Sequence, residues 1–481
     1  MSVTNELLRD TRTRLHIGGD WTEGEGLLDV FDPATEQLLA TVSVAGLDQA
    51  RLAVDAAWEA APGWAATAPR QRSDILRRAY DMMIAREDQL AELIILENGK
   101  TYTDAIGEVR YGAEFFRWFS EEAVRIMGEF RTAPRGDKRI VVIPEPVGVS
   151  LMVTPWNFPS AMATRKLGPA LAAGCTTILK PASDTPLSAL AVADILAEAG
   201  LPAGVVNVVT SRGSSGVVDA ILADPRVRKL SFTGSTEVGR LLMAKAGSRI
   251  MRTSMELGGN APFVVFEDAD IKAAIAGAML AKMRNAGETC VAANRFYVHA
   301  GIAGEFTSRL SDAMSSLRMG PGIVRSNQVG PMINAQAIEK IDDLVNSAVD
   351  DDATVLTGGR APDGPGHFYE PTVLSGVSQD SMILGHEIFG PVAPVVSFES
   401  EEEVVRAAND TEHGLISYVY TEDVNRAFRM AEAIESGMVA LNRGIISDEA
   451  APFGGVKQSG VGREGSHHGM EEFLELKYVA W

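Results

Sequence analysis

Apolar residues recur at helical spacing in the first hundred residues of the chain. Apolar positions three and four residues apart predict helices over Leu47–Ala61, Pro69–Arg86 and Gln89–Glu97. From about Ile140 the pattern changes to short runs rich in β-branched residues, which alternate with alanine-rich helical segments. The runs are Gly148–Val153, Thr176–Leu179, Val205–Val209, Lys229–Phe232 and Pro262–Phe266. The helical segments are Arg165–Ala173, Leu187–Ala199 and Ser214–Ala223.

Strand–helix alternation at this spacing is typical of a parallel sheet with right-handed crossovers. A second alternating block extends from Ile271 to about Val439. The chain of 481 residues is too long for a single small core and predicts about three domains. It ends in Leu474–Val479, a predicted strand that reaches outwards. Because terminal strands usually need a partner to be ordered, we expect a subunit contact there.

Composition and charge exclude several classes of partner and location. Hydrophobic residues make up 46% and charged residues 22%, as in an ordinary soluble globular protein. The net charge of −20 argues against nucleic acid or an anionic membrane as the main partner. Two prolines interrupt the longest uncharged stretch, Pro146–Thr164, and Met1–Leu15 lacks the apolar run of a signal peptide. Two cysteines form no disulfide framework, so the cytoplasm is the expected location.

Three side chains are candidates for chemistry. Cys290 follows a polar, glycine-containing stretch and is expected on an accessible loop, although a lone cysteine is more often an inert core residue. Cys175 lies in an apolar segment and fits that core role. Glu256 is followed by two glycines and, taken alone, fits a buried structural carboxylate and a catalytic one equally. Asn157 lies in a two-proline turn after a strand, where parallel sheets place site residues.

One glycine pattern is misleading. Residues 460–465 match the glycine spacing of a dinucleotide-binding loop, but Lys457–Ser459 before them is not a strand. The chain also ends before a second strand with an acidic residue could follow. We interpret this segment as a glycine-rich turn, and we expect no metal site in the protein.

Taken together, the motifs resemble those of the aldehyde dehydrogenase superfamily, in order and spacing, over essentially the whole chain. They are Asn157 in Pro-Trp-Asn-Phe-Pro, Glu256 in Glu-Leu-Gly-Gly-Asn, Cys290 in Gly-Glu-Thr-Cys and Glu387 in Glu-Ile-Phe-Gly-Pro. The resemblance implies that the Cys290 thiolate attacks the aldehyde, and that the Asn157 amide and the Cys290 N–H hold the oxyanion. Glu256 would activate the water that hydrolyses the thioester. Relatives that pass the acyl group to coenzyme A tend to lack this glutamate, so the free acid is the expected product.

The resemblance also implies a nicotinamide cofactor. Lys180 is similar to the lysine that binds the adenosine ribose, and Glu387 to the carboxylate that binds the nicotinamide ribose. Ser235 would cap a helix whose N–H groups face the pyrophosphate. NAD-preferring relatives often carry glutamate where this chain has the neutral Ser183, so we expect NADP, with NAD as the alternative. The further cofactor-binding positions are Thr154, Trp156, Gly234 and Phe389.

Within the family, the chain most resembles bacterial enzymes that oxidise succinate semialdehyde. In them two arginines and a serine hold the far carboxylate of the substrate; the matching positions are Arg165, Arg284 and Ser447. Arg284, six residues before Cys290, would also favour the thiolate. The alternative is that both arginines form structural ion pairs. An aromatic group either lines the entrance or forms a core face: Phe116, Trp118 and Phe119.

Two departures from the family pattern affect this interpretation. Ala292 stands where some relatives carry a second cysteine for a redox switch, so that switch is not expected here. Arg443 adds a positive charge near the expected carboxylate subsite and favours a wider substrate range. Glutarate semialdehyde and an aromatic aldehyde therefore stay open as substrates. A catalytically silent binding homologue would be expected to lose Cys290, Glu256 or Asn157.

The resemblance implies an architecture of three parts. Residues 1–125 and 144–255 would form a Rossmann-like α/β cofactor-binding domain, and residues 256–455 an α/β catalytic domain. Residues 126–143 and 465–481 would form a small β oligomerisation element. The expected assembly is a homodimer or a homotetramer.

Overall fold

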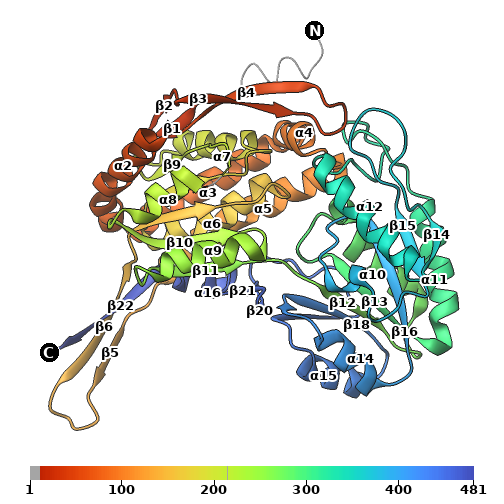
Figure 1. Ribbon diagram of the computed structural model, residues 1–481. Coiled ribbons are helices and arrows are strands. Elements are labelled where there is room, and N and C mark those ends of the chain that lie inside the picture. Colours follow the sequence, from red (N-terminus) through yellow and green to blue (C-terminus); the bar gives the residue numbers. More distant parts are fainter. Residues whose placement is uncertain (1–10, 214) are drawn as a thin grey trace.

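The computed structural model in Figure 1 describes residues 11–213 and 215–481 of the chain. Two α/β units are built on an eight-stranded and a seven-stranded sheet, and a narrow β-arm extends from the first unit. Two parts of the chain discussed above lie outside the described residues. They are most of Met1–Leu15, which lacks the apolar run of a signal peptide, and Ser214 at the start of a predicted helix. In the described part, no helix combines the length and apolar character needed to cross a bilayer.

The first sheet has the strand order β2-β1-β9-β8-β7-β10-β11-β21. Its five central strands pair in parallel, and antiparallel strands flank them on both sides. The central strands are almost wholly buried, as expected for a sheet covered by helices on both faces. The strands are β1 (Leu15–Ile17), β2 (Asp20–Thr22), β7 (Val149–Val153), β8 (Thr177–Lys180), β9 (Val206–Val208), β10 (Val227–Thr233), β11 (Arg252–Glu256) and β21 (Gly460–Val461).

Alternate residues of these strands face two separate cores. Leu151 and Phe232 pack with one set of helices, α2, α8 and α9. Met152 and Leu179 pack with the other set, α3 to α7. This alternation follows from the two-residue period of a strand. The helices are α2 (Leu47–Ala66), α3 (Pro69–Ala85), α4 (Glu87–Asn98), α5 (Tyr102–Glu122), η1 (Ala123–Arg125), α6 (Pro159–Ala173), α7 (Leu187–Glu198), α8 (Ser215–Ala223) and α9 (Thr236–Gly247).

The second sheet has the order β14-β15-β16-β13-β12-β18-β19 and is parallel apart from the edge pair β14–β15. Its strands are β12 (Ala261–Val265), β13 (Ala293–His299), β14 (Thr354–Thr357), β15 (Thr372–Ser375), β16 (Val392–Phe398), β18 (Ile416–Tyr420) and β19 (Met438–Leu441). Its helices are α10 (Ile271–Met283), η2 (Arg284–Gly287), α11 (Ala300–Ser315), α12 (Ala335–Asp350), α13 (Met382–Gly385), α14 (Glu401–Asn409) and α15 (Val424–Ala433).

The projecting arm joins two distant parts of the chain. β6 (Arg139–Pro146) pairs antiparallel with β5 (Glu129–Thr132) and with the terminal strand β22 (Leu474–Ala480). The predicted terminal strand is therefore present, next to the segment expected to accompany it (Figure 1). The remaining elements are β3 (Gly26–Phe31), β4 (Leu38–Val44), β17 (His413–Gly414), β20 (Val456–Lys457) and α16 (Ser466–Glu471).

The structure differs from the sequence expectation mainly near the N-terminus. The first part of the chain was expected to be helical, but residues 15–44 form strands. A left-handed pair, Gly18 and Gly19, turns β1 back onto β2, and β1 then joins the first sheet beside β9. These short strands lack the alternation that identifies longer ones. Helix α6 starts six residues earlier than predicted because Pro159 occupies the first helical turn, where proline is favourable.

Candidate active site

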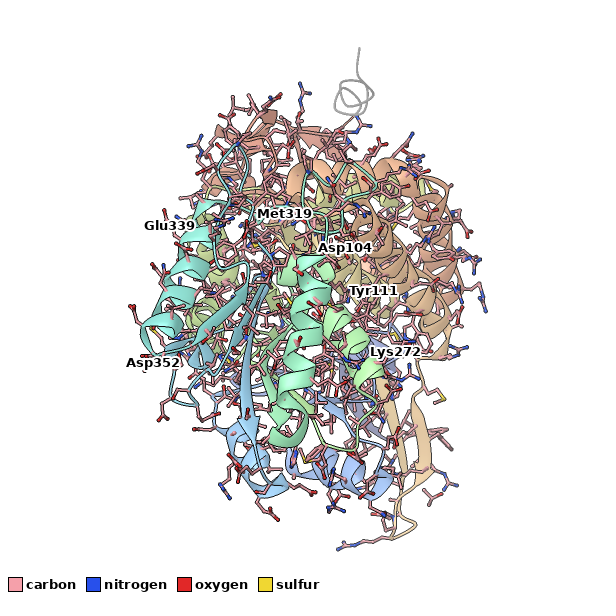
Figure 2. The ribbon with its side chains drawn as sticks, turned by 90° about the vertical axis from the view of Figure 1, so that its right-hand side faces the viewer. Asp104, Tyr111, Lys272, Met319, Glu339 and Asp352 are labelled. Atoms are coloured by element: carbon pink, nitrogen blue, oxygen red, sulfur yellow. The ribbon has the colours of Figure 1, made fainter. Side chains whose placement is uncertain are left out.

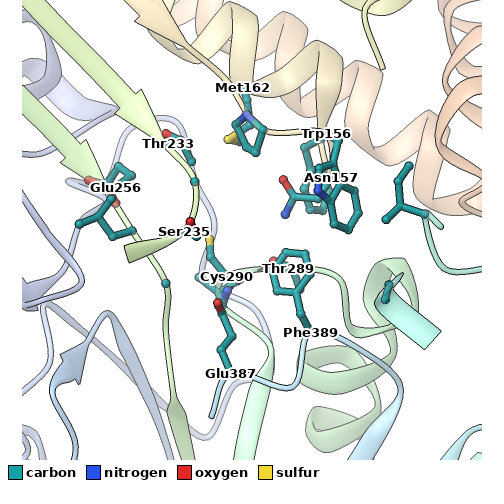
Figure 3. Close-up of a pocket in the computed structure, with 18 of the residues that line it drawn as sticks. Trp156, Asn157, Met162, Thr233, Ser235, Glu256, Thr289, Cys290, Glu387 and Phe389 are labelled. Carbon is teal, nitrogen blue, oxygen red and sulfur yellow. Dashed lines mark hydrogen bonds between the residues drawn. The ribbon is translucent and has the colours of Figure 1, made fainter. Parts of the chain in front are cut away.

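A cavity of about 670 Å³ is lined by residues of both α/β units (Figure 3). It lies beyond the carboxyl ends of β7, β10 and β11, where a parallel sheet places its ligand site. The cavity brings together Asn157, Glu256 and Cys290 from three separate segments. Eight other predicted site residues also line it: Trp156, Arg165, Gly234, Ser235, Arg284, Glu387, Phe389 and Ser447.

The loop before β13 presents Cys290 to this cavity, where its side chain is partly exposed. Asn285 and Ala286 adopt the left-handed conformation, with φ of 51° each, and Gly287 follows with φ of 83°. A Cβ at Gly287 would lie 2.2 Å from the Gly390 carbonyl oxygen, so only glycine fits there. Two successive non-glycine residues in the left-handed conformation are strained, and such strain is usually retained at functional sites. Here the turn aims the cysteine at the space between the two sheets.

Asn157 is held by contacts from both units. The amide Nδ2 of Asn157 donates to the Glu288 carbonyl at 3.0 Å. The Asn157 carbonyl oxygen accepts from Lys100 Nζ at 2.6 Å and from Asn285 Nδ2 at 3.1 Å. Lys100 is itself paired with the buried Glu108 at 2.7 Å. The predicted oxyanion amide is therefore tied to the loop that carries the cysteine.

Two N–H groups remain free to bind a developing oxyanion. An amide Nδ2 has two protons, and the Glu288 carbonyl uses one of those of Asn157. The backbone N–H of Cys290 donates to no group in residues 11–213 and 215–481. Preorganised donors of this kind typically lower a barrier by about 3–4 kcal/mol each. In Figure 3 the Asn157 and Cys290 side chains lie on opposite sides of one open space.

The thiol of Cys290 is protonated at neutral pH in this environment. Burial raises the pKa of Cys290 to about 12, and the positive charge of Arg165 offsets only part of that rise. The carboxylates of Glu387, Glu256 and Glu464 raise the pKa further. Arg165 is therefore an arginine that favours the thiolate. A base must take the proton before the sulfur attacks.

Glu256 ends β11 and reaches the cavity from the first sheet (Figure 3). Its Oε2 is buried and accepts no hydrogen bond from the described residues. Burial, and then the negative charge of Glu464, raise the pKa of Glu256 well above its ordinary value. A carboxylate with a raised pKa and a free oxygen has the properties of a general base.

Sequence reasoning missed Glu464, which lies in the glycine-rich turn. Its carboxylate contacts Arg165 Nε at 2.7 Å and Lys166 Nζ at 2.5 Å. These two cations keep the pKa of Glu464 below its ordinary value although the group is buried. Arg165 therefore lines the cavity and also forms the buried ion pair that was the alternative expectation. Its Nη2 donates to no group in the described chain.

Arg284 and Ser447 line the catalytic cavity and also a second one of about 590 Å³ beside it. Arg284 forms no ion pair with any described carboxylate, and its guanidinium lies 5.0 Å from the centre of the Phe158 ring. An arginine without a carboxylate partner is available to an anionic ligand. Tyr111, also missed by sequence reasoning, lines both cavities between these groups. Its position four residues before the buried Phe115 on one amphipathic helix was the available signal.

Two expectations about the substrate side need correction. Phe119 lies fully buried in the helical core with Phe116 and does not line the cavity, so the core-face interpretation holds. Residues of α5 and α6 present Tyr111 and Met162 to the cavity instead. Arg443 is exposed and lines neither cavity, because the chain turns it outwards after β19.

The predicted nicotinamide-side residues meet on one wall. The Glu387 carboxylate accepts from the Gly259 N–H at 3.0 Å, and its carbonyl accepts from Lys340 Nζ at 2.6 Å. Trp156 and Phe389 contact each other edge to face, with ring centres 5.4 Å apart. Ser235 caps α9 as expected, accepting from the Val238 N–H at 3.4 Å. Three more residues that sequence reasoning missed line this wall: Gln336, Ala337 and Lys340.

Lys180, Ser183 and Thr154 lie near the ends of β7 and β8, outside the cavity lining. Burial lowers the pKa of Lys180 to about 8. Its ammonium has no hydrogen-bond or ion-pair partner in the described chain, as expected of a group that awaits a phosphate or hydroxyl ligand. Ser183 Oγ donates to the Ser211 carbonyl at 2.9 Å, which fixes a neutral side chain there. These residues fit a phosphate-bearing dinucleotide.

Other features noted in the sequence lie outside the catalytic cavity. The glycine-rich segment includes β21, and Gly460 packs so closely on Met255 that a Cβ would lie 2.1 Å from its carbonyl oxygen. Cys175 is buried, and its Sγ lies 3.4 Å from the Phe473 carbonyl. Among described side chains, one exposed group could hold a metal ion, on α16 away from the cavity: His467, His468 and Glu471.

Comparison with known proteins agrees with this site. The profile described as "Aldehyde dehydrogenase family" matches residues 21–479. A succinate-semialdehyde dehydrogenase of Paenarthrobacter nicotinovorans is 55% identical, over 92% of this chain and 98% of that protein. A glutarate-semialdehyde dehydrogenase of Pseudomonas aeruginosa is 48% identical, over 97% of each. The crystal structure of an E. coli NADP-dependent enzyme, 47% identical, superposes with a TM-score of 0.97 over 99% of each chain. This chain belongs to the aldehyde dehydrogenase family.

Proposed function

We propose that this protein oxidises a short aldehyde bearing a distal carboxylate, with succinate semialdehyde favoured, to the free acid, using NADP. The observation that carries the proposal is the pairing of two sites in one cavity. Cys290, Asn157 and Glu256 would be the reacting and oxyanion-binding groups, and Arg284 and Ser447 would bind the carboxylate. An unpaired arginine in a chain of net charge −20 is a selective place for an anion.

The first step forms a bond between Cys290 Sγ and the aldehyde carbon. The thiol loses its proton to a base, and Glu256 is a carboxylate of this cavity that has a raised pKa and an Oε2 without a hydrogen bond from the described residues. The carbonyl π electrons move to oxygen, which Asn157 Nδ2 and the Cys290 N–H hold as an oxyanion. The product of this step is a tetrahedral thiohemiacetal.

The second step turns the thiohemiacetal into a thioester as its C–H bond breaks. The bound cofactor supplies the hydride acceptor for this step. Once Glu256 has released the Cys290 proton to solvent, its carboxylate takes a proton from water while the resulting hydroxide attacks the thioester carbon. The C–S bond then breaks to release the acid and the Cys290 thiolate. Because the carboxylate of Glu256 must be free, its raised pKa makes this hydrolysis faster as the pH rises.

A longer semialdehyde is the second candidate substrate. Arg284 and Ser447 also face the cavity of about 590 Å³, which leaves room beyond a four-carbon chain. The relative named for glutarate semialdehyde supports the same extension. Both candidates share a carboxylate, and they differ by one methylene, a difference worth about 1–3 kcal/mol in a pocket of fixed length.

NADP is the proposed cofactor, and NAD the alternative. Lys180 is buried, and the negative charge of Asp184 offsets only part of the resulting fall in its pKa, while Ser183 brings no negative charge that would repel a 2′-phosphate. Glu387, Trp156 and Phe389 would hold the nicotinamide end beside Cys290. In this assignment residues 1–125 and 144–255 bind the cofactor, and residues 256–455 carry the catalytic chemistry.

The arm supports a homodimer or homotetramer as the assembly. Phe130 and Leu476 are 64% and 72% exposed on one three-stranded sheet, and Trp481, directly after β22, is 78% exposed. Exposed apolar residues on a narrow sheet usually mark an interface. Both cysteines are free thiols, which agrees with the proposed cytoplasmic location.

Initial rates on the purified protein test the substrate proposal. Succinate semialdehyde and an uncharged four-carbon aldehyde are each paired with NADP and with NAD. We expect kcat/KM to favour the charged aldehyde by tenfold or more, about 1.4 kcal/mol. Arg284→Met should remove most of that preference, whereas the exposed Arg443→Met serves as the control and should leave it unchanged. Equal use of the two aldehydes by the native enzyme contradicts the carboxylate subsite.

A further inference from the structure

Tyr111 of α5 carries a polar group for which the described fold provides no partner. Its hydroxyl is buried and forms no hydrogen bond with any described residue. Tyr111 lines both the catalytic cavity and the cavity beside it, so this residue lies where the two adjoin. In Figure 2 the label of Tyr111 lies where the N-terminal helices border the helices of the second α/β unit.

A second orphaned donor belongs to the same wall. Arg165 Nη2 is buried and unpartnered within residues 11–213 and 215–481, while Arg165 Nε is paired with Glu464. Buried donors are normally satisfied by protein, water or ligand. Two unsatisfied donors on residues that line one cavity indicate a place built for an acceptor that arrives from outside.

The charges around Tyr111 specify the sign of that acceptor. Arg165 and Arg284 are the two groups that lower the pKa of Tyr111, so both lie within electrostatic reach of its hydroxyl. Burial outweighs them and keeps the net pKa of Tyr111 above its ordinary value, so the hydroxyl stays protonated and can donate. A neutral donor flanked by two cations suits a carboxylate, whose oxygens together accept about four hydrogen bonds.

Glu464 explains why a donor besides the arginines is useful. Because Arg165 Nε is ion-paired with the buried carboxylate of Glu464, part of the Arg165 charge is already compensated within the fold. Arg284, held over Phe158 and free of ion pairs with described carboxylates, supplies the unshared charge. The Tyr111 hydroxyl, within electrostatic reach of both arginines, can donate a further hydrogen bond to the same carboxylate.

We propose that Tyr111 is a specificity-determining residue, whose hydroxyl donates to the distal carboxylate of the substrate together with Arg284 and Ser447. This inference rests on the proposed function and adds a recognition contact to it. The ring itself packs edge to face on Phe115, with centres 4.9 Å apart. A merely structural Tyr111 would act through that packing and would treat charged and uncharged aldehydes alike.

Tyr111→Phe tests the contact, because it removes one oxygen and keeps the ring. Under saturating NADP, kcat/KM is measured for succinate semialdehyde and for an uncharged four-carbon aldehyde. We expect kcat/KM for the charged substrate to fall tenfold or more, chiefly through a higher KM. The value for the uncharged aldehyde should stay within twofold. Tyr80→Phe is the matched control on α3, since Tyr80 lines neither cavity, and it should change neither value.

A second measurement supports the same conclusion without turnover. Inhibition by succinate, the product acid, should weaken in Tyr111→Phe by a similar factor, while inhibition by its uncharged diamide should not change. Thermal unfolding of the variant checks that the fold is intact.

Three results would overturn the inference. Equal losses for the charged and uncharged aldehydes would assign Tyr111 a packing role. Unchanged kinetics in Tyr111→Phe, with the native preference for the charged aldehyde intact, would reject this contact alone. A native enzyme without any such preference would reject the proposed substrate, and this inference with it.

Discussion

The reactivity of Cys290 toward an alkylating reagent is a direct measure of the electrostatics of the site. Burial raises the thiol pKa from an ordinary 9 to about 12, against the partial opposition of Arg165. Three pKa units correspond to about 4 kcal/mol of cost for the thiolate relative to an unperturbed thiol. At pH 7 the thiolate fraction is then about 10⁻⁵, compared with about 10⁻² for a thiol of pKa 9.

Iodoacetamide inactivation in the absence of cofactor is the assay, because the thiolate is the species that reacts. The rate constant should rise about tenfold per pH unit from pH 6 to 10, with no plateau, since the pKa lies above that range. At pH 7 it should be about a thousandfold below that of an exposed cysteine. The background Cys175→Ala leaves Cys290 as the single thiol and removes a fully buried one.

The contribution of the Arg165 charge to the Cys290 pKa is tested in the same Cys175→Ala background. Arg165→Gln removes the cation that lowers the Cys290 pKa, so inactivation should become slower still at every pH. A plateau below pH 9 would contradict the raised pKa of Cys290, and faster inactivation in Arg165→Gln would contradict the effect of the Arg165 charge on it. Either result would mean that the resting enzyme stores a thiolate stabilised by groups other than Arg165.

Three further predictions concern the other groups of the site. In a rapid-mixing experiment, Glu256→Gln should release a burst of about one NADPH per Cys290 and then stop, because thioester hydrolysis lacks its base. Normal turnover without a burst would show that Glu256 is not that base. The rising limb of the pH–kcat profile should lie above the ordinary glutamate pKa. Glu464→Gln should move this limb to lower pH, because it removes a negative charge beside Glu256. An upward shift, or no shift, contradicts the effect of Glu464 on the Glu256 pKa. Ser183→Glu should shift the ratio of kcat/KM for NADP over NAD at least tenfold toward NAD, and an unchanged ratio would remove Ser183 from the 2′-phosphate site.

The proposed catalytic residues, which the structure gathers in one cavity, could be identified in the sequence because each lies in a local motif. Asn157 sits in a rigid turn after a strand, Cys290 in a glycine-containing loop, and Glu256 beside two glycines that admit no side chain near the cofactor wall. The alternation of strands and helices was equally local, because its periods of about two and 3.6 residues are visible in the chain. Sequence alone therefore determined the α/β class, the family resemblance and the reacting groups.

The tertiary structure decided how the charges around those groups are shared. Glu464 lies 299 positions after Arg165, in a segment that reads as a plain turn, and yet it is ion-paired with that arginine. Phe119 and Tyr111 lie on the same helix, but one faces the core and the other the cavity. The pKa of a buried group and the face of a helix depend on which distant segments pack against it, and a linear pattern does not contain that information.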